Sequence, residues 1–308
     1  MNKRQTITRI ASVGAVLAIG TMTLGACSGS SSSGSSSSPS TSGSAVPSVS
    51  ADPALVAKVP AAIKSTGKLV IGTDASYAPA EFFAENGSTI IGYDVDLGKA
   101  IAAKLGLTAD FQNATFDSII PAVENNKYNA SMSSFTITPE REAKVNMVSY
   151  FSAGTSWAAA KGNPSGISPD NACGKTVAVQ KGTVQVDTLD AKNKACTTAA
   201  KPAISIQQFS LQTDVSTAVV SGKADAMLAD SPVTGYAIKQ TGGKLEQIGS
   251  VTDTAPQGVV VAKTQAELSA VIQQAIQALM TDGTYKAILD VWGVGSGAIT
   301  TSELNPKV

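Results

Sequence analysis

The residues best suited to hold a small anion lie in one short stretch, residues 132–141, which reads MSSFTITPER. Thr138 is a good helix N-cap and Pro139 suits a first helical position, so Arg141 falls in the first turn, where the helix dipole disfavours a cation. A guanidinium can bind a carboxylate bidentately, and nearby hydroxyl and backbone N–H groups can complete the site. The stretch therefore predicts a carboxylate clamp, although taken alone Arg141 could equally be a surface arginine.

The elements that would position this clamp alternate between strands and helices. The apolar runs predict strands at 68–73, 109–112, 128–133, 176–180, 204–207, 224–229 and 258–262. The apolar periodicity predicts helices from Asp94, over 116–125, from 184, over 211–221, from 230–232, over 266–280 and from 284. The folded part should begin near Asp52, with Pro60 interrupting its first helix. This order is that of βαβ units and predicts an α/β protein whose parallel sheets are covered by helices.

Polar and aromatic residues gather where several of these strands end, which is where open α/β sheets bind ligands. They are Asp74, Tyr77, Ser133, Ser134, Thr136, Gly182, Thr183 and Asp230. Together with Arg141 they supply a cation, anions and an aromatic side chain, a set that suits a small zwitterion. Two simpler interpretations stay open: Tyr77 and Phe116 could be core aromatics, and Asp230 could be an N-cap before Pro232. We interpret Asp225 as structural.

The N-terminus is typical of a targeting segment. Lys3, Arg4 and Arg9 precede the apolar residues 10–24, a run too short for a membrane-spanning helix. It ends in LGAC, which resembles the lipobox of bacterial lipoproteins and implies a signal peptide over 1–26 and a lipid on Cys27. Residues 27–52 are mostly serine and predict a flexible tether of roughly 25–30 Å. An ordinary signal peptide with a chance cysteine is the alternative.

Charge and cysteine content exclude several classes of protein. Removal of residues 1–26 takes away three basic residues, which leaves 20 basic against 23 acidic side chains and argues against a nucleic-acid partner. Cys173 and Cys196 form an even pair on an exported chain, so a disulfide is expected. The chain has no histidine, which excludes Ser-His and Cys-His catalysis and most zinc sites. We expect no metal and no cofactor.

Several motifs, taken in order, resemble the polar amino-acid substrate-binding proteins of ABC importers, solute-binding protein family 3. The resemblance runs from Lys68 to about Val294. It rests on the segments GTDASYAPAEFF, GYDVDLGKAIAAKLGL, FDSIIPAVENNKYNASMSS, AVQKGT, VSGKADAMLAD and DGTYKAILDVWG. It implies a type II periplasmic-binding-protein fold of two lobes joined by two crossing segments, near 153–156 and 255–258. Lobe 1 would be 53–155 plus 257–308, and lobe 2 would be 156–256.

The resemblance also implies roles for the candidate residues. Arg141 would hold the ligand α-carboxylate with the backbones of Thr136 and Thr183, next to Gly182. Asp230 would hold the α-ammonium beside Ser134 and Ser133. Tyr77 and Phe116 would pack on the ligand side chain, while Asp74 and Gln180 would contact its tip. Because Asp74 accepts hydrogen bonds, we expect glutamine, asparagine, histidine, lysine or arginine before acidic or aliphatic ligands.

The function that the resemblance implies is extracytoplasmic capture of a polar or basic amino acid and delivery to an ABC permease. The protein would be a monomer, held to the outer face of the cell membrane by its lipid. The alternative is an exported enzyme on the same fold, similar to cyclohexadienyl dehydratases, with Glu81 or Asp74 as its acid. A receptor sensor domain is a third possibility.

Overall fold

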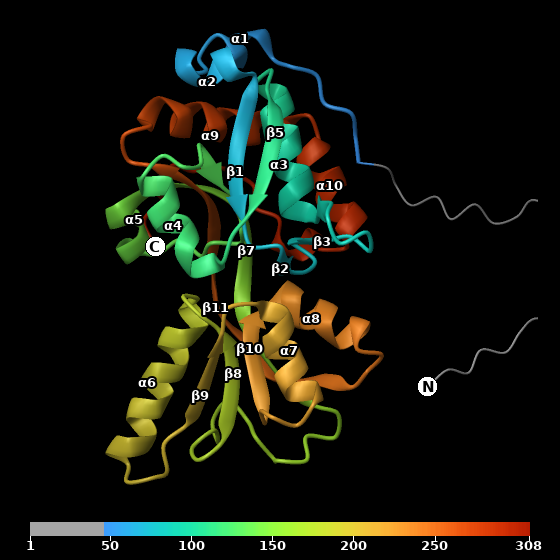
Figure 1. The fold of residues 1–308 in the computed structure, drawn as a ribbon, viewed down its shortest axis with the longest axis vertical. Coiled ribbons are helices and arrows are strands. Elements are labelled where there is room, and N and C mark those ends of the chain that lie inside the picture. Colours follow the sequence, from blue (N-terminus) through green and yellow to red (C-terminus); the bar gives the residue numbers. More distant parts are fainter. Residues whose placement is uncertain (1–45) are drawn as a thin grey trace, which may run out of the picture. The chain divides into compact units, whose positions relative to one another are not determined.

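The computed structural model describes residues 46–308. The predicted signal peptide, Cys27 and the tether up to residue 45 lie outside the described residues. Two groups of strands, one from each half of the fold, are joined through two long strands into one eight-stranded sheet with the order β5-β1-β6-β11-β7-β10-β8-β9. Figure 1 shows the two long strands, β7 and β11, running between an upper and a lower lobe.

The strands of the first lobe pair in parallel around a central β1. They are β1 (Lys68–Thr73), β5 (Thr108–Asn113) and β6 (Ala130–Ser131). Leu69 and Ile71 of β1 are buried, and the strand ends at Thr73 and Asp74, which are buried too. A small antiparallel sheet follows, made of β2 (Ser76–Tyr77), β3 (Glu81–Phe83) and β4 (Ile90–Ile91). The carboxyl ends of β1 and β6 therefore meet at one edge, as the sequence predicts.

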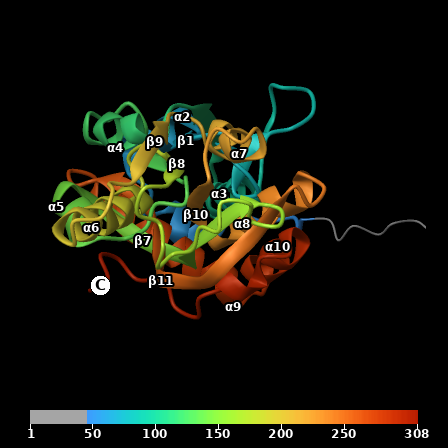
Figure 2. The same cartoon turned by 90° about the horizontal axis from the view of Figure 1, so that it is seen from below.

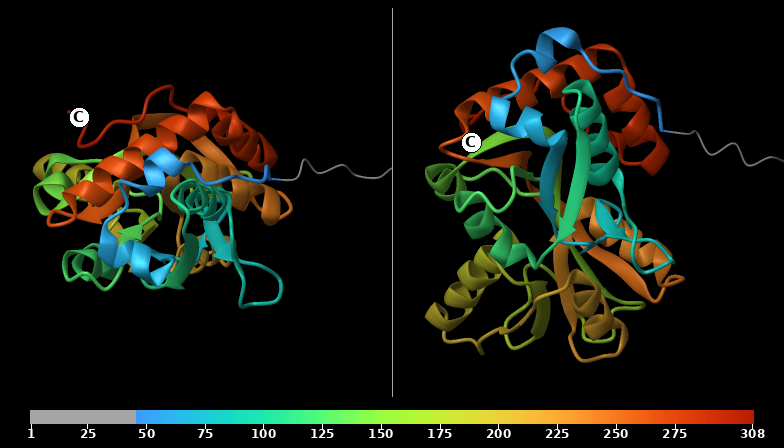
Figure 3. Two further views of the ribbon diagram at one scale, coloured as in Figure 1. Left: turned by 90° about the horizontal axis from the view of Figure 1, so that it is seen from above. Right: turned by 45° about the horizontal axis from the view of Figure 1, so that its top comes forward.

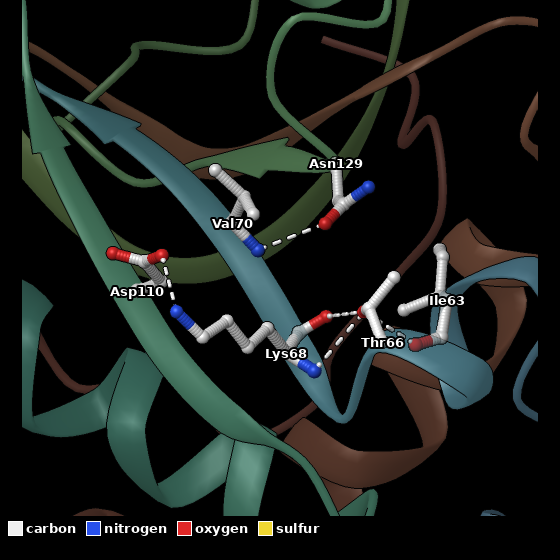
Figure 4. A network of polar contacts seen from close by, with 6 residues as sticks. All are labelled: Ile63, Thr66, Lys68, Val70, Asp110 and Asn129. Carbon is white, nitrogen blue, oxygen red and sulfur yellow. Dashed lines mark hydrogen bonds and ion pairs between the residues drawn. The ribbon is translucent and has the colours of Figure 1, made fainter.

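A polar network fixes the opposite end of β1 (Figure 4). Lys68 forms an ion pair of 3.3 Å with Asp110 of β5, and the Val70 N–H donates to Asn129 Oδ1 at 2.8 Å. The Thr66 hydroxyl donates to the Ile63 carbonyl at 2.7 Å and closes the preceding helix. These contacts tie β1 to both of its neighbours. Asp74 follows the other end of the same strand.

Helices cover both faces of the first-lobe sheet. They are α1 (Pro53–Val56), α2 (Ala61–Thr66), α3 (Tyr93–Lys104), α4 (Phe116–Glu124), α5 (Pro139–Lys144), α9 (Ala266–Thr281), α10 (Thr284–Trp292) and the 3₁₀ turn η1 (Gly295–Gly297). Figure 3 shows α1 and α2 (blue) beside α9 (red), where Lys58 donates to Gln274 at 2.6 Å. Asp52 caps α1 through the Ala54 N–H, and α2 resumes after Pro60, as expected.

One predicted cap is wrong. Gly92, and not Asp94, is the N-cap of α3, and its φ of 139° belongs to a region that favours glycine. A Cβ at this position would collide with the Ala80 carbonyl. Asp94 lies inside the first turn, completely buried, with its carboxylate turned away from the helix end toward Ser134 and Tyr150.

The second lobe repeats the parallel arrangement. Its strands are β8 (Thr176–Gln180), β9 (Ser205–Phe209) and β10 (Ala226–Asp230), and its helices are α6 (Val184–Thr198), α7 (Gln212–Val220) and α8 (Ser231–Gln240). Figure 2 shows α6 on one side of these strands and α7 and α8 on the other. Its core contains Trp157, Val177, Leu189 and Leu228. Asp225 accepts a hydrogen bond from the Thr176 N–H at 2.8 Å, which agrees with its structural interpretation.

Two strands cross between the lobes and pair antiparallel along most of their length. They are β7 (Val145–Ala160) and β11 (Leu245–Ala262), whose register shifts three times between Ile248 and Gly258. At Gly154, a Cβ would lie 2.5 Å from Val251 Cγ1 and 2.7 Å from the Thr252 carbonyl oxygen, so the close approach of the crossing strands requires glycine. The fold confirms the prediction of a two-lobed α/β protein with mostly parallel sheets.

Two further expectations concern the covalent frame and the membrane. Cys173, just before β8, is bonded to Cys196 of α6, the pairing that the cysteine count predicts. Within residues 46–308, no helix combines the length and the apolar character that crossing a bilayer requires.

Candidate ligand site

The strand ends of the two lobes meet around a small space. Nine residues line it: Tyr77, Phe116, Ser134, Thr136, Arg141, Thr183, Val184, Gln185 and Asp230. Its volume is about 10 Å³, roughly that of one water molecule. An amino acid therefore enters only when the lobes move apart. Seven of these nine residues are among those that the sequence predicts.

Arg141 forms one wall of this space. Thr138 caps α5 by accepting from the Arg141 N–H at 3.2 Å, as predicted. The guanidinium donates to the Thr136 carbonyl at 2.8 Å and to the Gly182 carbonyl of the other lobe at 3.1 Å. It also lies over the stacked rings of Phe116 and Phe135, 5.6 and 5.4 Å from their centroids. Burial lowers the pKa of Arg141, against the attraction of Asp230. The aromatic rings and carbonyls hold the cation in place, and no carboxylate among residues 46–308 forms an ion pair with it.

Asp230 supplies the opposite charge from the end of β10. Asp230 occupies the N-cap position of α8, as one interpretation of the sequence expects, but its side chain makes no capping bond to the helix. Instead its two oxygens accept from Gln185 Nε2 and Gln257 Nε2, both at 2.8 Å. Burial raises its pKa to about 6, although these amides, Tyr77 and Arg141 favour the charged form. Arg141 and Asp230 thus present opposite charges to one small space.

The backbone of Ser134 adopts a left-handed conformation, with a φ of 52°. Non-glycine residues rarely adopt it, and such strain concentrates at functional sites. The Ser134 N–H donates to Asp94 Oδ2 at 3.0 Å, and this bond stabilises the conformation. Ser133 lies one step behind, where its hydroxyl accepts from the Asp74 N–H at 3.0 Å.

Asp74 and Gln180 lie beyond the lining residues. Asp74 Oδ1 accepts from the N–H and hydroxyl of Ser76, at 3.1 and 2.6 Å. Its Oδ2 accepts from the Phe116 N–H at 2.8 Å and from Gln180 Nε2 at 2.9 Å. Burial raises the pKa of Asp74, and these four hydrogen bonds lower it. The second lobe thus places a neutral hydrogen-bond donor directly on the carboxylate of Asp74.

Further contacts close the two lobes over the site. The Ser76 hydroxyl accepts from the Gln212 N–H at 3.0 Å, and the Tyr77 hydroxyl accepts from the Asp230 N–H at 3.1 Å. Lys181 forms an ion pair of 2.7 Å with Asp117. Outside this contact, a groove of about 590 Å³ runs between α4, α5 and α6 and reaches Arg141. The groove is the mouth of the interlobe cleft.

The structure thus brings the predicted residues together, but only some of them line the space. Asp74, Ser133, Gln180 and Gly182 are not in the lining; they support it through the hydrogen bonds described above. The sequence prediction missed Gln185 and Gln257, which hold Asp230. A polar residue in the first turn of a helix that follows a strand end is a usable signal for Gln185. Gln257 lies within a crossing strand and carries no comparable signal.

Comparison with known proteins agrees with this geometry. The sequence profile of the bacterial extracellular solute-binding proteins, family 3, matches residues 69–295. The chain belongs to this family. The arginine-binding protein ArgT of Corynebacterium glutamicum is 32% identical over 256 residues, which cover 83% of this chain and 84% of the relative.

Solved structures of family 3 relatives have the same fold. An ancestral arginine-binding protein, solved bound to arginine, is 33% identical, with a TM-score of 0.68 over 73% of this chain and 98% of its own. The ancestral amino-acid-binding protein AncCDT-1, described as a precursor of cyclohexadienyl dehydratase, is 34% identical, with a TM-score of 0.65 over 75% of this chain and 97% of its own. The family membership predicted from the sequence motifs is confirmed.

Proposed function

We propose that this family 3 protein is the substrate-binding component of an ABC importer and that its ligand is a basic amino acid, with arginine the first candidate. The observation that carries the proposal is the pair of opposite charges, Arg141 and Asp230, that face one space between Tyr77 and Phe116. The α-carboxylate would bind Arg141 and the α-ammonium would bind Asp230. Each buried charge would then have an opposite partner, which offsets its desolvation.

The negative charge of Asp74 supports a basic side chain on the ligand. Asp74 is 1% exposed and belongs to the supporting network, not to the clamp. Of the described residues that enclose the space, Arg141 alone is basic. Once the zwitterion has neutralised Arg141 and Asp230, Asp74 still lacks a cation. A guanidinium or ammonium tip would supply it by replacing the Gln180 amide on Asp74 Oδ2.

The relatives favour arginine within this class. ArgT of C. glutamicum carries arginine in its name, and the ancestral relative was solved with arginine as well as with glutamine. Both ligands end in N–H donors, as the interpretation of Asp74 requires.

We also propose the cellular setting. Cys27 carries a lipid that anchors the mature chain to the outer face of the cell membrane, and residues 27–52 tether a monomeric binding domain. Lobe 1 comprises 53–155 plus 257–308, and lobe 2 comprises 156–256. Cys27→Ser should release the protein from the membrane fraction or block its maturation. Membrane retention of a fully processed Cys27→Ser variant would refute the lipid anchor.

Isothermal titration calorimetry of residues 46–308 against the twenty common amino acids tests the function. We expect tight binding of arginine, weaker binding of lysine or glutamine, and none of leucine or glutamate. A ligand at 100 times its Kd should add about 2.7 kcal/mol of stability. Exclusive binding of acidic or aliphatic amino acids would refute the ligand class.

The enzyme alternative is tested on the same sample with prephenate and arogenate. Glu81, one of its nominated acids, is fully buried and does not line the space, and Asp74 holds four hydrogen bonds. We therefore expect no product. Turnover of either compound would replace the transport function by the dehydratase.

A further inference from the structure

Two fully buried carboxyl groups lie directly behind the serines of the site. Glu81 of β3 and Asp94 of α3 are both 0% exposed. The Ser133 hydroxyl donates to Glu81 Oε1 at 2.9 Å, and the Ser134 N–H donates to Asp94 Oδ2 at 3.0 Å. The Tyr150 hydroxyl donates to the same Asp94 oxygen at 2.6 Å. One oxygen of each acid therefore accepts hydrogen bonds from neighbouring residues.

The other two oxygens, Glu81 Oε2 and Asp94 Oδ1, are buried and have no hydrogen-bond partner among the described residues, and the two side chains lie within hydrogen-bonding reach of each other. Two ionised carboxylates only accept hydrogen bonds, so they cannot satisfy one another. One proton between them turns one oxygen into a donor and removes both the repulsion and the missing bonds. A shared proton would account for both buried oxygens.

The environment assigns this proton to Glu81. Burial, followed by the charge of Asp94, raises the pKa of Glu81 well above its usual range. The pKa of Asp94 is raised by burial only to about 6, because hydrogen bonds from Tyr150 and Ser134 stabilise its charged form. At neutral pH the pair is therefore a protonated Glu81 that donates to an ionised Asp94.

We propose that Glu81 keeps its proton in the folded protein and, by donating a hydrogen bond to Asp94, acts as a positioning residue that fixes Asp74, Ser133 and Ser134 in the ligand site. With the hydrogen bond from Glu81 to Asp94, the path of hydrogen bonds is continuous. It starts at the Asp74 N–H, passes through the Ser133 hydroxyl to Glu81 and Asp94, and ends at the Ser134 N–H. Loss of the proton would leave two adjacent buried negative charges beneath the ligand. The inference rests on the proposed function only for its effect on affinity.

Six titratable groups surround Glu81. They are Asp74 after β1, Tyr77 of β2, Tyr93 and Asp94 of α3, Tyr150 of β7 and, further across the site, Asp230 of β10. The charged groups among them are all acids, so none stabilises an ionised Glu81. Burial raises the pKa of each of the three tyrosines well above its usual range, so these hydroxyls stay neutral over the working pH range.

Protonation can be tested on the ligand-free wild-type protein. Infrared spectroscopy at pH 7.2 should show the C=O band of the protonated Glu81. Asp94 and Asp230, with pKa values of about 6, are then mostly ionised, and four hydrogen bonds favour the charged form of Asp74. The band should disappear in Glu81→Gln and persist in Glu85→Gln, which removes an exposed carboxyl from the same hairpin. Absence of the band in the wild type would overturn the proposal, even if Glu81→Gln failed to fold.

Folding equilibria give a second readout. Between pH 6 and 7.5 the folded wild type should hold about one proton more than its unfolded chain at this site. The unfolding constant of the wild type, divided by that of Glu81→Gln, should therefore rise about tenfold per pH unit. A flat ratio would contradict the shared proton.

Affinity tests the positioning role. Glu81→Gln replaces the O–H donor by an N–H donor and should keep the Kd for arginine within about threefold. Glu81→Leu has a similar volume but no donor and should weaken binding at least tenfold. Equal affinity of both variants would leave Glu81 without a positioning role. If the wild type binds no amino acid, the proposed function fails, while the infrared and folding results still decide the protonation.

Discussion

Asp74 of the first lobe and Gln180 of the second share a hydrogen bond of 2.9 Å across the cleft. Both residues are 1% exposed. The Gln180 amide also donates to the Ser210 carbonyl at 3.2 Å, while its own oxygen has no partner within the described residues. The amide therefore holds the place on Asp74 that a donor-tipped ligand would take.

Asp74→Asn should change which ligand is preferred. A hydrogen bond to a charged group contributes about 1.5–3 kcal/mol, so arginine should bind roughly 10- to 150-fold more weakly. Glutamine should lose less affinity than arginine, because its tip carries no charge that Asp74 neutralises and its amide can still donate to the asparagine oxygen. Calorimetry with both ligands measures the difference. Asp110→Asn, at the opposite end of the sheet, is the matched control and should change neither affinity.

Arg141→Ala and Asp230→Ala should each abolish one half of the clamp. Removal of one partner of a buried ion pair costs about 3–5 kcal/mol, so the Kd should rise at least a hundredfold. Lys144→Ala removes a partly exposed cation from the same short helix and should leave the Kd unchanged. If both clamp variants kept wild-type affinity, the ligand would lie elsewhere.

Binding should depend on pH through Asp230. Its pKa rises from 3.8 to about 6 on folding, so the folded ligand-free protein holds the proton more tightly than the unfolded chain. The free energy of unfolding therefore falls as pH rises from about 4 to 6. Ligand affinity changes in the opposite direction, because only the ionised carboxylate pairs with an ammonium.

At pH 5 the Kd should thus be roughly tenfold higher than at pH 7.5. Asp230→Asn binds weakly but should lose this pH dependence, which separates Asp230 from Asp94. A Kd that stays constant from pH 5 to 7.5 in the wild type would contradict the assignment.

Gly182→Ala should oppose closure of the lobes. Gly182 has a φ of 81°, and a Cβ there would lie 3.0 Å from Asp117 Cβ of the first lobe. Gly222, with a φ of 73° and no atom within 4 Å of an added Cβ, is the control because it shares the backbone strain without the lobe contact. Each alanine should lower stability by about 1–2 kcal/mol. Only Gly182→Ala should also weaken ligand binding, and equal affinities would refute its role in closure.

The disulfide should contribute to stability. Cys173 and Cys196 are 23 residues apart, and the chain-entropy estimate for such a loop is about 3–3.5 kcal/mol. The double variant Cys173→Ser/Cys196→Ser should unfold at a lower denaturant concentration than the wild type. Intact mass with thiol labelling should find no free thiol in the unreduced protein. Two labelled thiols would contradict the bond.

Local chemistry explains what the sequence could predict. The Thr138 cap, the Pro60 break and the strand 68–73 depend on neighbouring residues only, and all three appear in the structure. The gathering of strand ends follows from parallel topology, which the alternation of elements already implies. The lining therefore contains most of the predicted residues.

Contacts between distant segments explain which features the sequence could not predict. Gln257 of the crossing strand β11 meets Asp230 at the end of β10 although 27 residues separate them, and Glu81 meets Asp94 because a hairpin folds onto α3. The Asp94 pattern, an acid before an amphipathic run, is typical of an N-cap, yet Gly92 takes that place for steric reasons. Buried polar partners of this kind depend on tertiary packing and leave no periodic trace in the sequence.

The position of β11 in the sheet has a consequence for the order of assembly. β11 lies between β6 and β7, although it follows all second-lobe strands in the chain. When synthesis has reached residue 240, β8, β9 and β10 can already pair with one another and with β7. The first lobe, though begun first, still lacks a central strand and the helices α9 and α10. During vectorial synthesis or export, the second lobe can therefore complete its core before the first lobe does. The N-terminal strands of the first lobe can pack fully only after the C-terminal segment has been made.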